Sequence, residues 1–149
     1  MNTSTSRPAT TADLQVRLHR VFTDHRGSLV PLELANAVPF LIARLFWVFA
    51  TPAGGTRGGH AHCQCVQYLI CQRGAVEVTA DDGEAQRTLV LEAGAGLLIP
   101  PAIWAEQRYL TPDTMLLVLC NRPYEAEDYI EAVADVKSFR EQMRAEGPR

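Results

Sequence analysis

Short apolar segments separated by turn signals run from Leu14 to Leu119, and this pattern constrains the fold more than any other feature of the chain. Segments of about 4–8 residues bounded by Gly, Pro and Asp are typical of strands in an antiparallel sandwich or barrel. The candidate strands are residues 16–22, 28–34, 43–50, 59–65, 66–72, 75–80, 86–91, 96–99, 106–109 and 115–120. The dipeptide Asp82-Gly83 predicts the clearest hairpin. We therefore expect an all-β fold.

The C-terminal tail has a different period. Val136, Phe139 and Met143 recur at helical spacing, which predicts a short amphipathic helix from Asp135 that packs against the sheet. A chain of 149 residues is long enough for one domain with a substantial core. We expect a flexible leader at residues 1–12, a barrel domain at 13–134, and the helix with its tail at 135–149.

Composition excludes several classes of protein. The net charge of −3 and the pI near 5.8 argue against a nucleic-acid-binding surface, which needs clustered Lys and Arg. No apolar run approaches the roughly 20 residues of a membrane-spanning helix. The first residues lack the apolar core of a secretion signal, so we expect a cytoplasmic protein. The four cysteines lack paired spacing and are expected to be structural thiols without disulfides.

Two histidines, His60 and His62, follow a glycine-rich turn at the start of a strand-like segment. Side chains at positions i and i+2 of a strand lie on the same face, so the two imidazoles are expected to lie side by side. Imidazole binds metals well and has a pKa near neutrality. The pair therefore indicates either a metal site or proton-transfer chemistry.

The spacing around the pair resembles the first motif of the cupin barrels, G-x5-H-x-H-x4-E-x6-G. Gly54, His60, His62 and Gly74 fit this motif, whereas Gln67 replaces the acidic metal ligand. The resemblance implies a cupin fold, which is a jelly-roll or double-stranded β-helix barrel.

The second cupin motif, G-x5-P-x-G-x2-H, is only half present. Gly94 and Pro100 fit it, but Ala102 and Ala105 replace its second glycine and its histidine. A catalytic divalent metal usually needs three or more strong side-chain ligands, and only the two histidines are left here. We therefore expect no metal at this site and assign the imidazoles to proton transfer.

Several runs, taken in order, resemble the sugar 3,4-ketoisomerases that act on dTDP-4-keto-6-deoxyglucose. The runs are Asp24-His25-Arg26-Gly27-Ser28-Leu29-Val30, Pro39-Phe40-Leu41-Ile42-Ala43-Arg44, Arg57-Gly58-Gly59-His60-Ala61-His62, Gln67-Tyr68-Leu69-Ile70-Cys71, Asp81-Asp82-Gly83, Gly96-Leu97-Leu98-Ile99-Pro100-Pro101-Ala102-Ile103-Trp104 and Asp128-Tyr129-Ile130. The resemblance implies an enzyme that needs no metal or cofactor and moves the keto group of a dTDP-linked hexose from C4 to C3, in the synthesis of amino-deoxysugars. It also implies a homodimer with an exchanged N-terminal strand, here within Val16 to Leu34.

The resemblance also assigns roles to individual residues. Isomerisation removes the C3 proton, forms an enediol and returns a proton at C4, so it needs a base with a pKa near neutrality. His62 is the expected base, His60 is its partner, and Arg44 is expected to stabilise the enediolate oxygen. Arg26 and Arg57 are expected to bind the diphosphate, because guanidinium groups pair with phosphate oxygens. Two further expected substrate contacts are Gln67 and Trp104.

This chain departs from the family pattern at three places, one of which is the pair Cys63 and Gln64, where lysines are common. Phe46 and Trp47 stand where family members often carry two tyrosines, and Ala105 stands where they often carry a histidine. The alternatives are therefore a non-catalytic cupin that binds nucleotide sugars and a related cupin epimerase. Epimerases of that kind use a His–Asp pair, and the sequence reveals no evident partner for such a pair.

Overall fold

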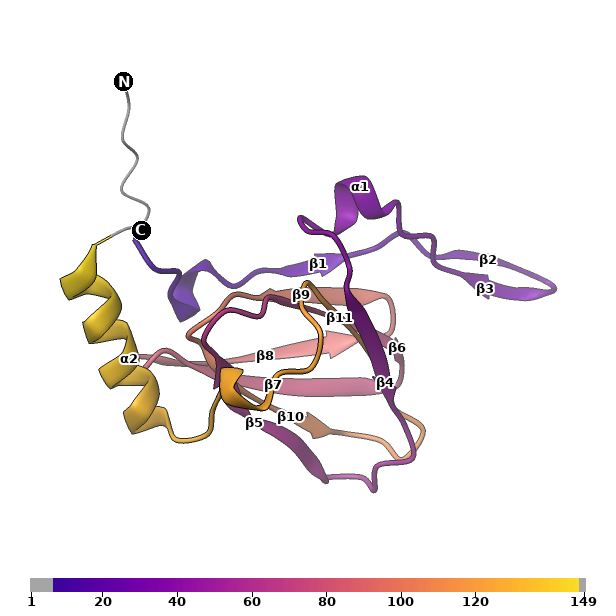
Figure 1. The fold of residues 1–149 in the computed structure, drawn as a ribbon. Helices are drawn as coiled ribbons and strands as arrows, with labels where there is room; N and C mark the ends of the chain where they lie inside the picture. The colour runs from indigo at the N-terminus through magenta and orange to yellow at the C-terminus, as the bar shows by residue number, and fades with distance from the viewer. Residues whose placement is uncertain (1–6, 148–149) are drawn as a thin grey trace.

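The computed structural model describes residues 7–147 and contains two five-stranded antiparallel sheets that face each other (Figure 1). The first sheet, in spatial order, contains β1 (Val16–Leu18), β9 (Ala95–Ile99), β6 (Gln67–Arg73), β11 (Met115–Cys120) and β4 (Arg44–Val48). The second contains β12 (Tyr129–Ile130), β5 (Thr56–His62), β10 (Trp104–Tyr109), β7 (Ala75–Asp81) and β8 (Gln86–Glu92). The predicted all-β cupin architecture with a short C-terminal helix is confirmed.

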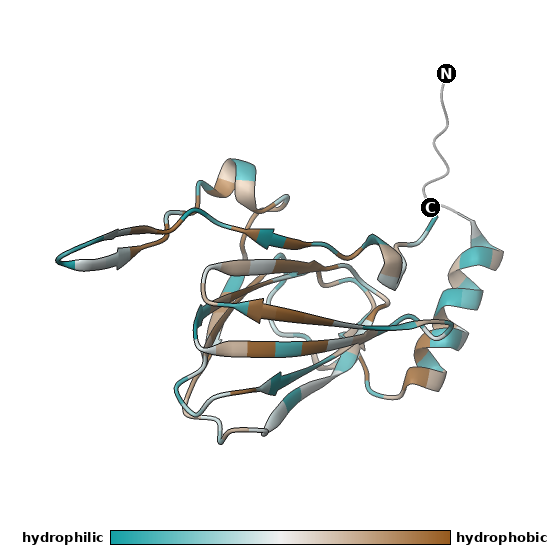
Figure 2. Cartoon of the chain, turned by 180° about the vertical axis from the view of Figure 1, so that it is seen from behind, coloured by the Kyte–Doolittle hydropathy of each residue, from teal (hydrophilic) through white to brown (hydrophobic). Residues whose placement is uncertain are grey.

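The main core lies between the two sheets because alternate side chains of each strand point inward. The burial pattern of β7 shows this period directly, since Val76, Val78 and Ala80 are fully buried and their neighbours are not. Leu69 and Leu116 of the first sheet pack against these side chains in a single cluster. Figure 2 shows the corresponding hydrophobic stretches along the strands. Full burial of each large aliphatic side chain contributes about 1.5–3 kcal/mol.

The predicted hairpin at Asp82-Gly83 is confirmed, since β7 and β8 pair antiparallel up to Asp81 and Gln86. The Asp82 carboxylate is buried and accepts hydrogen bonds from the backbone N–H groups of Glu84 and Ala85 within the turn. Its second oxygen accepts hydrogen bonds from Thr11.

Thr11 lies within the segment expected to be a flexible leader, and its placement differs from that expectation. It begins a short 3-10 helix, η1 (Thr11–Asp13), and is buried. Its N–H and hydroxyl both donate to Asp82, at 2.9 and 3.1 Å. This part of the leader packs on the barrel because a buried carboxylate needs donors. Residues 1–6 of the expected leader lie outside the described residues.

The predicted strands 16–22 and 28–34 are only partly confirmed. After β1 the chain forms a two-stranded hairpin, β2 (Phe22–Asp24) and β3 (Gly27–Leu29), which projects away from both sheets (Figure 1). We call this hairpin the N-terminal arm. Pro31 follows it and has no N–H to continue a strand ladder, and the short helix α1 (Leu34–Ala37) occupies the end of the predicted strand.

The predicted C-terminal helix is α2 (Val133–Glu146), which begins two residues before the expected start. Val136 is fully buried, and Phe139 and Met143 are partly buried on the same stripe, as the period predicted. Arg140 is also buried and donates a hydrogen bond to the Ala102 carbonyl at 2.9 Å, which ties the helix to the barrel. Within residues 7–147, no helix combines the length and apolar character that crossing a membrane requires.

Candidate active site

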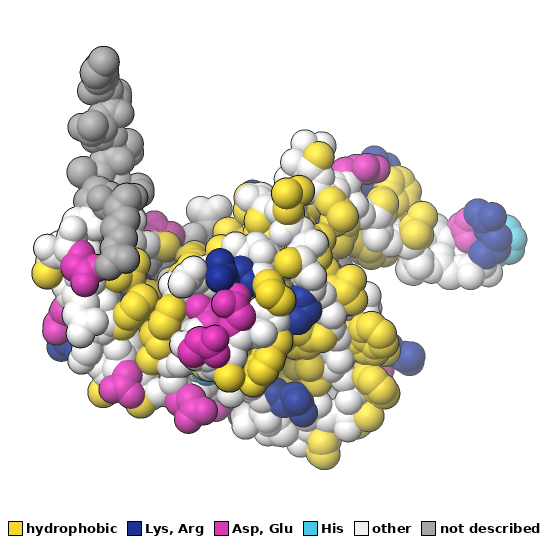
Figure 3. All heavy atoms as spheres, in the orientation of Figure 1, with side chains coloured by type: hydrophobic (Ala, Val, Ile, Leu, Met, Phe, Trp, Pro, Cys, Tyr) yellow, Lys and Arg dark blue, Asp and Glu magenta, His cyan; other side chains and the backbone are white. Residues whose placement is uncertain are grey.

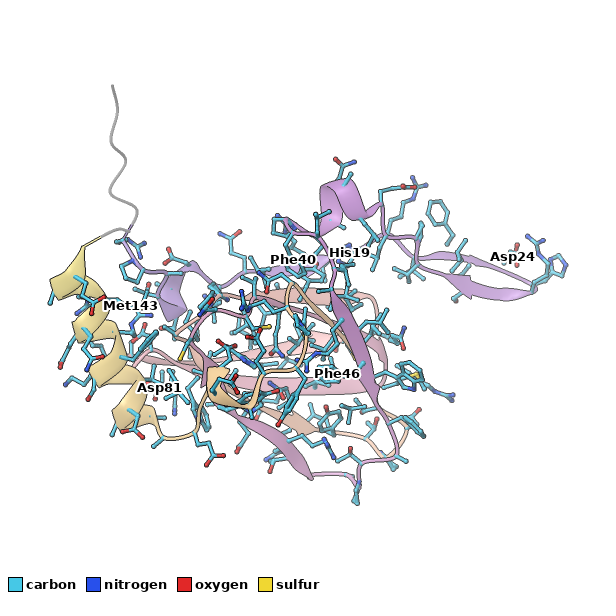
Figure 4. All side chains as sticks on the ribbon, viewed as in Figure 1. His19, Asp24, Phe40, Phe46, Asp81 and Met143 are labelled. Carbon is cyan, nitrogen blue, oxygen red and sulfur yellow. The ribbon has the colours of Figure 1, made fainter. Side chains whose placement is uncertain are left out.

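A cavity of about 290 Å³ opens between the two sheets and contains both imidazoles in its wall. The polar and aromatic residues of the wall are Phe46 and Trp47 from β4, Arg57, His60 and His62 from β5, Gln67 from β6, Gln107 and Tyr109 from β10, and Tyr129 from β12. Strands from both sheets therefore contribute to one site, and Phe46, labelled in Figure 4, marks its β4 side.

A β-bulge sets the position of the histidines. Along β5, His60 pairs with Ala105 and Gly58 pairs with Glu106, so Gly59 is an additional residue in this strand. Gly58 and Gly59 both have positive φ, at 82° and 80°, which glycine adopts without steric cost. A Cβ on Gly58 would lie 3.0 Å from the Ala105 carbonyl oxygen. The two glycines therefore permit the bend that aims the following histidines.

His60 and His62 lie on the same face, as their spacing predicted. Their ring centroids are 5.0 Å apart and the rings are perpendicular. Tyr129 contacts both rings, with centroid distances of 4.7 Å to His60 and 4.5 Å to His62. These three rings form one aromatic cluster on the cavity wall.

Asp128 is the buried partner of His62. The Nδ1 atom of His62 lies 3.0 Å from Oδ2 of Asp128, and both side chains are less than a tenth exposed. The carboxylate also accepts hydrogen bonds from the backbone N–H groups of Gln64 and Cys65. This acidic partner was not evident from the sequence, because Asp128 lies 66 residues away and the fold alone brings the two together.

The Asp128 contact fixes the tautomer of His62. A carboxylate accepts hydrogen bonds, so the proton of neutral His62 lies on Nδ1 and the lone pair lies on Nε2. Nε2 is buried and has no hydrogen-bond partner among the described residues. Burial lowers the pKa of His62, and Asp128 opposes this shift only in part. The ring is thus held neutral, with a basic nitrogen free to accept a proton.

The pKa of His60 is also lowered, first by burial and then by the proximity of His62. Two neighbouring imidazoles disfavour each other's protonation because both would carry positive charge. Only one of them can readily take up a proton at a time, which suits a pair that alternates between the base and acid forms.

Arg44 is not among the residues that line the cavity, but it lies next to Tyr129 of the aromatic cluster. Its guanidinium faces the rings of Phe46 and Tyr124 at 5.5 and 5.6 Å and donates to the Cys120 sulfur at 3.7 Å. Burial lowers its pKa, but the Cys120 thiol and the Tyr129 phenol more than offset this effect, and the pKa rises overall. Arg44 therefore carries a permanent positive charge next to the cluster.

The side chains near His62 include three possible metal ligands. Among the described residues, the ligand atoms of His62, Cys65 and Asp128 lie within 4.8 Å of one another. However, Asp128 already accepts hydrogen bonds from His62 and from the Cys65 backbone, and the pKa of the Cys65 thiol is raised, chiefly by its contact with Cys120 and by burial. Gln67 donates its amide to the Cys120 sulfur at 3.7 Å. These contacts hold Asp128 and Cys65 in place beside His62.

Five of the seven predicted site residues gather in or beside the cavity: His60, His62, Arg57 and Gln67 line it, and Arg44 lies next to Tyr129. The other two lie elsewhere within this chain. The Trp104 indole donates to the Glu131 carbonyl at 2.9 Å, and Trp104 is absent from the cavity wall because the β10 side chains that face the cavity are those of Ala105, Gln107 and Tyr109. Arg26 is at the tip of the arm, next to Asp24 (Figure 4).

Three residues of the site did not follow from the sequence pattern: Asp128, Tyr129 and Tyr109. The Asp128-Tyr129-Ile130 run carries the only available signal, a carboxylate and a phenol placed just before the C-terminal helix. The hydroxyl of Tyr109 is buried, lacks a hydrogen-bond partner among the described residues, and belongs to a side chain on the cavity wall.

Comparisons with known proteins identify several similar proteins. Residues 12–144 match the family described as FdtA: WxcM-like, C-terminal. A TDP-4-oxo-6-deoxy-alpha-D-glucose-3,4-oxoisomerase from Aneurinibacillus thermoaerophilus is 36% identical over 117 residues, covering 78% of this chain and 84% of that protein.

Two solved structures have the same architecture. A 3,4-ketoisomerase from Helicobacter canadensis is 30% identical with a TM-score of 0.79, covering 87% of this chain and 98% of that one. A sugar 3,4-ketoisomerase from Thermoanaerobacterium thermosaccharolyticum, in complex with TDP, is 27% identical with a TM-score of 0.80, covering 89% of this chain and 97% of that one. A histidine-to-asparagine mutant of the latter enzyme is in complex with TDP-4-keto-6-deoxyglucose.

Proposed function

Because this chain belongs to the FdtA family of sugar 3,4-ketoisomerases, we propose that it moves the keto group of a dTDP-linked 4-keto-6-deoxyhexose from C4 to C3. The observation that carries this proposal is the buried His62–Asp128 pair, in which the Nε2 of His62 has no partner among residues 7–147 and belongs to a ring on the cavity wall. The thymidine diphosphate part of the substrate is proposed from the relatives, which include enzymes in complex with TDP and with TDP-4-keto-6-deoxyglucose.

The first chemical step is removal of the C3 proton by Nε2 of His62. The adjacent C4 carbonyl makes this proton acidic, and the electron pair of the C3–H bond enters a C3–C4 double bond. Asp128 stabilises the imidazolium that results, since it accepts a hydrogen bond from Nδ1–H and carries the opposite charge. Return of the proton to C4 completes the transfer between carbons and needs no redox cofactor.

Arg57 is suited to the diphosphate because it lines the cavity and is itself exposed. Arg26 lies on the projecting arm, and the corresponding contact needs a second copy of the chain. We propose a homodimer in which the arm of one protomer crosses to the other, with Arg26 serving the partner's site. The cytoplasmic location and the independence from metal stay predictions.

Two features of the surface support the homodimer. The arm projects away from both sheets, and its Phe22 and Leu29 are exposed. The edge strand β4 and the residues on either side of it expose large apolar side chains, including Leu41, Trp47 and Phe49. Figure 3 shows hydrophobic side chains gathered on this face. Contiguous exposed apolar surface of this kind marks an interaction site.

The proposal is tested by incubating the purified protein with dTDP-4-keto-6-deoxyglucose in D2O. Proton exchange at C3 and formation of a 3-keto product, both followed by NMR, are expected. His62→Asn removes the base and is expected to lower both rates by a factor of about 10³ or more. His19→Asn is the matched control, because His19 lies outside the cavity and contacts Tyr68.

The outcomes separate the alternatives. Tight binding of the dTDP-sugar without exchange at C3 identifies a non-catalytic binding protein. Exchange with inversion at C3 and no 3-keto product identifies an epimerase, which the His62–Asp128 pair makes the second candidate, since both reactions begin with removal of the C3 proton. Full activity of His62→Asn places the base elsewhere.

A further inference from the structure

We propose that Tyr129 is a second catalytic residue, which exchanges protons with the O4 and O3 oxygens of the sugar while His62 serves the carbons. This inference rests on the proposed function and adds a residue to it. A 3,4-isomerisation moves protons on two oxygens as well as on two carbons, and a single imidazole cannot make all of these transfers at once.

The position of Tyr129 follows from the sheet. It pairs directly with His62 across the β12–β5 ladder, and paired residues of an antiparallel ladder project their side chains to the same side. Its ring lies 4.5 Å from that of His62 and 4.7 Å from that of His60, and it lines the same cavity. A substrate carbon that reaches Nε2 of His62 therefore places its neighbouring oxygens close to the phenol.

Among the described residues, two phenols line the cavity, and only one is near the imidazoles. Ala105 pairs with His60, and Tyr109 lies four residues further along β10. At about 3.3 Å per residue, this separation is about 13 Å. Phe46 and Trp47 also line the cavity but carry no phenol, so Tyr129 is the phenol in place for the reaction.

The proton balance closes with His62 and Tyr129 alone. As the C3–H bond breaks, its electron pair forms the C3–C4 double bond, and the C4 carbonyl oxygen takes the phenolic proton. The Tyr129 phenolate then removes the proton from the O3 hydroxyl, the C3 carbonyl forms, and the double-bond electrons take the His62 proton at C4. Both side chains return to their starting forms, and no oxidant or reductant is consumed.

Arg44 supports the phenolate intermediate. Its guanidinium lies close enough to Tyr129 for the phenol to contribute to its raised pKa, and it is held in place by Cys120 and by the rings of Phe46 and Tyr124. A fixed positive charge beside a phenol stabilises the anion that forms during proton transfer. Arg44 was predicted to stabilise the enediolate oxygen. In this proposal it acts indirectly, by stabilising the Tyr129 phenolate.

The test is Tyr129→Phe, which keeps the ring contacts with both imidazoles and removes only the hydroxyl. Exchange at C3 and formation of the 3-keto product are measured in the same D2O experiment by NMR. We expect isomerisation to fall about 100-fold, and exchange at C3 to fall much less, so that the ratio of exchange to isomerisation rises about tenfold or more. Exchange at C3 uses the phenol only at O4, whereas isomerisation uses it at O4 and again at O3, so loss of the hydroxyl slows isomerisation more than exchange.

Tyr124→Phe is the matched control, because Tyr124 is exposed, contacts Tyr129 and has no contact with either imidazole among the described residues. In Tyr124→Phe, the ratio of C3 exchange to isomerisation is expected to stay at the wild-type value. An unchanged ratio in Tyr129→Phe, whether both rates fall together or neither falls, overturns the role of Tyr129. Absence of exchange and of product in the wild-type protein overturns the proposed function itself, so the two failures are distinguishable.

Discussion

Asp128, beside the cavity, and Arg26, on the N-terminal arm, differ in burial and in how far away in the sequence their partners lie. Asp128 is only 8% exposed and accepts three hydrogen bonds, each from a residue more than 60 positions away in the sequence. Arg26 has a side chain that is 79% exposed, and its ion pair is with Asp24, two residues away. The interaction at Asp128 is built by the fold, whereas the interaction at Arg26 would form in an isolated hairpin.

This difference indicates which parts of the site one chain completes. The His62–Asp128 pair is positioned by the packing of β5 and the segment that ends in β12, and it needs no second protomer. The arm has no such support, since an isolated two-stranded hairpin is marginally stable in water. Its side chains become useful only where another surface receives them, and the proposed dimer supplies that surface.

The strongest test of the interior is Asp128→Asn. Loss of the carboxylate removes the fixed tautomer of His62 and the stabilisation of its protonated form, so kcat is expected to fall by about 10² or more. Because Asp128 raises the His62 pKa against the effect of burial, the acid limb of the pH–rate profile should also move to lower pH. Asp113→Asn, at an exposed ion pair with Arg73, is the control. A wild-type rate in Asp128→Asn would show that His62 does not depend on this partner.

The second test is the dependence on pH. Burial lowers the pKa of His60 and of His62 from the ordinary value of about 6.5. The base must be neutral, so kcat/KM should stay constant down to pH 6.5 and then, below the lowered pKa, fall about tenfold per pH unit. The free energy of unfolding should also decrease as the pH falls below 6.5, because the unfolded chain binds protons more readily.

The arm should respond differently to the same change. Arg26 lowers the pKa of Asp24, so Asp24 is protonated and the ion pair is lost only at much lower pH. Chemical denaturation at several pH values and a pH–rate profile together check the prediction. An acid limb above pH 6.5 would contradict the lowered pKa values.

The third test concerns the arm itself. Arg26→Gln should raise KM about tenfold with little change in kcat, as expected for lost phosphate binding. If Arg26 acts on the partner's site, refolding Arg26→Gln together with His62→Asn creates heterodimers that contain one intact site. About a quarter of all sites then regain the low KM.

Two results would separate the possibilities for the arm. Failure of the mixture to recover, despite heterodimers seen by native mass spectrometry, would place Arg26 in its own protomer's site or outside any site. Arg73→Gln, another exposed arginine, is the control that should leave KM unchanged.

The contrast between interactions built by the fold and interactions within one short segment explains which features the sequence could predict. The shared face of His60 and His62 follows from the period of a strand, and the C-terminal helix follows from the spacing of Val136, Phe139 and Met143. The pairing of Asp128 with His62 does not, because β12 is only two residues long and carries no period. The arm was predicted as parts of longer strands because its apolar residues resemble those of a core strand, and sequence alone does not say which surface covers them.

The smallest effect is expected at Tyr109. The polar group of Arg26 is exposed and paired with Asp24, whereas that of Tyr109 lies inside the protein. Its hydroxyl is fully buried without a partner among the described residues, and burial raises its pKa to about 12. An unsatisfied buried hydroxyl is costly, so Tyr109→Phe should increase the free energy of unfolding by about 1 kcal/mol. Tyr68→Phe is the control of opposite sign, since the Tyr68 hydroxyl lies 2.6 Å from His19 and its loss should destabilise.

Stability and substrate affinity should then move in opposite directions at Tyr109. If the substrate hydrogen-bonds to this hydroxyl, Tyr109→Phe is more stable but has a KM raised about three- to tenfold. Urea denaturation and steady-state kinetics on the same preparation measure both quantities. A destabilised variant would mean that the hydroxyl already has a partner in the free protein. A stabilised variant with unchanged KM would mean that the substrate does not use it, and the cavity's recognition would then depend on Arg57 and Gln67.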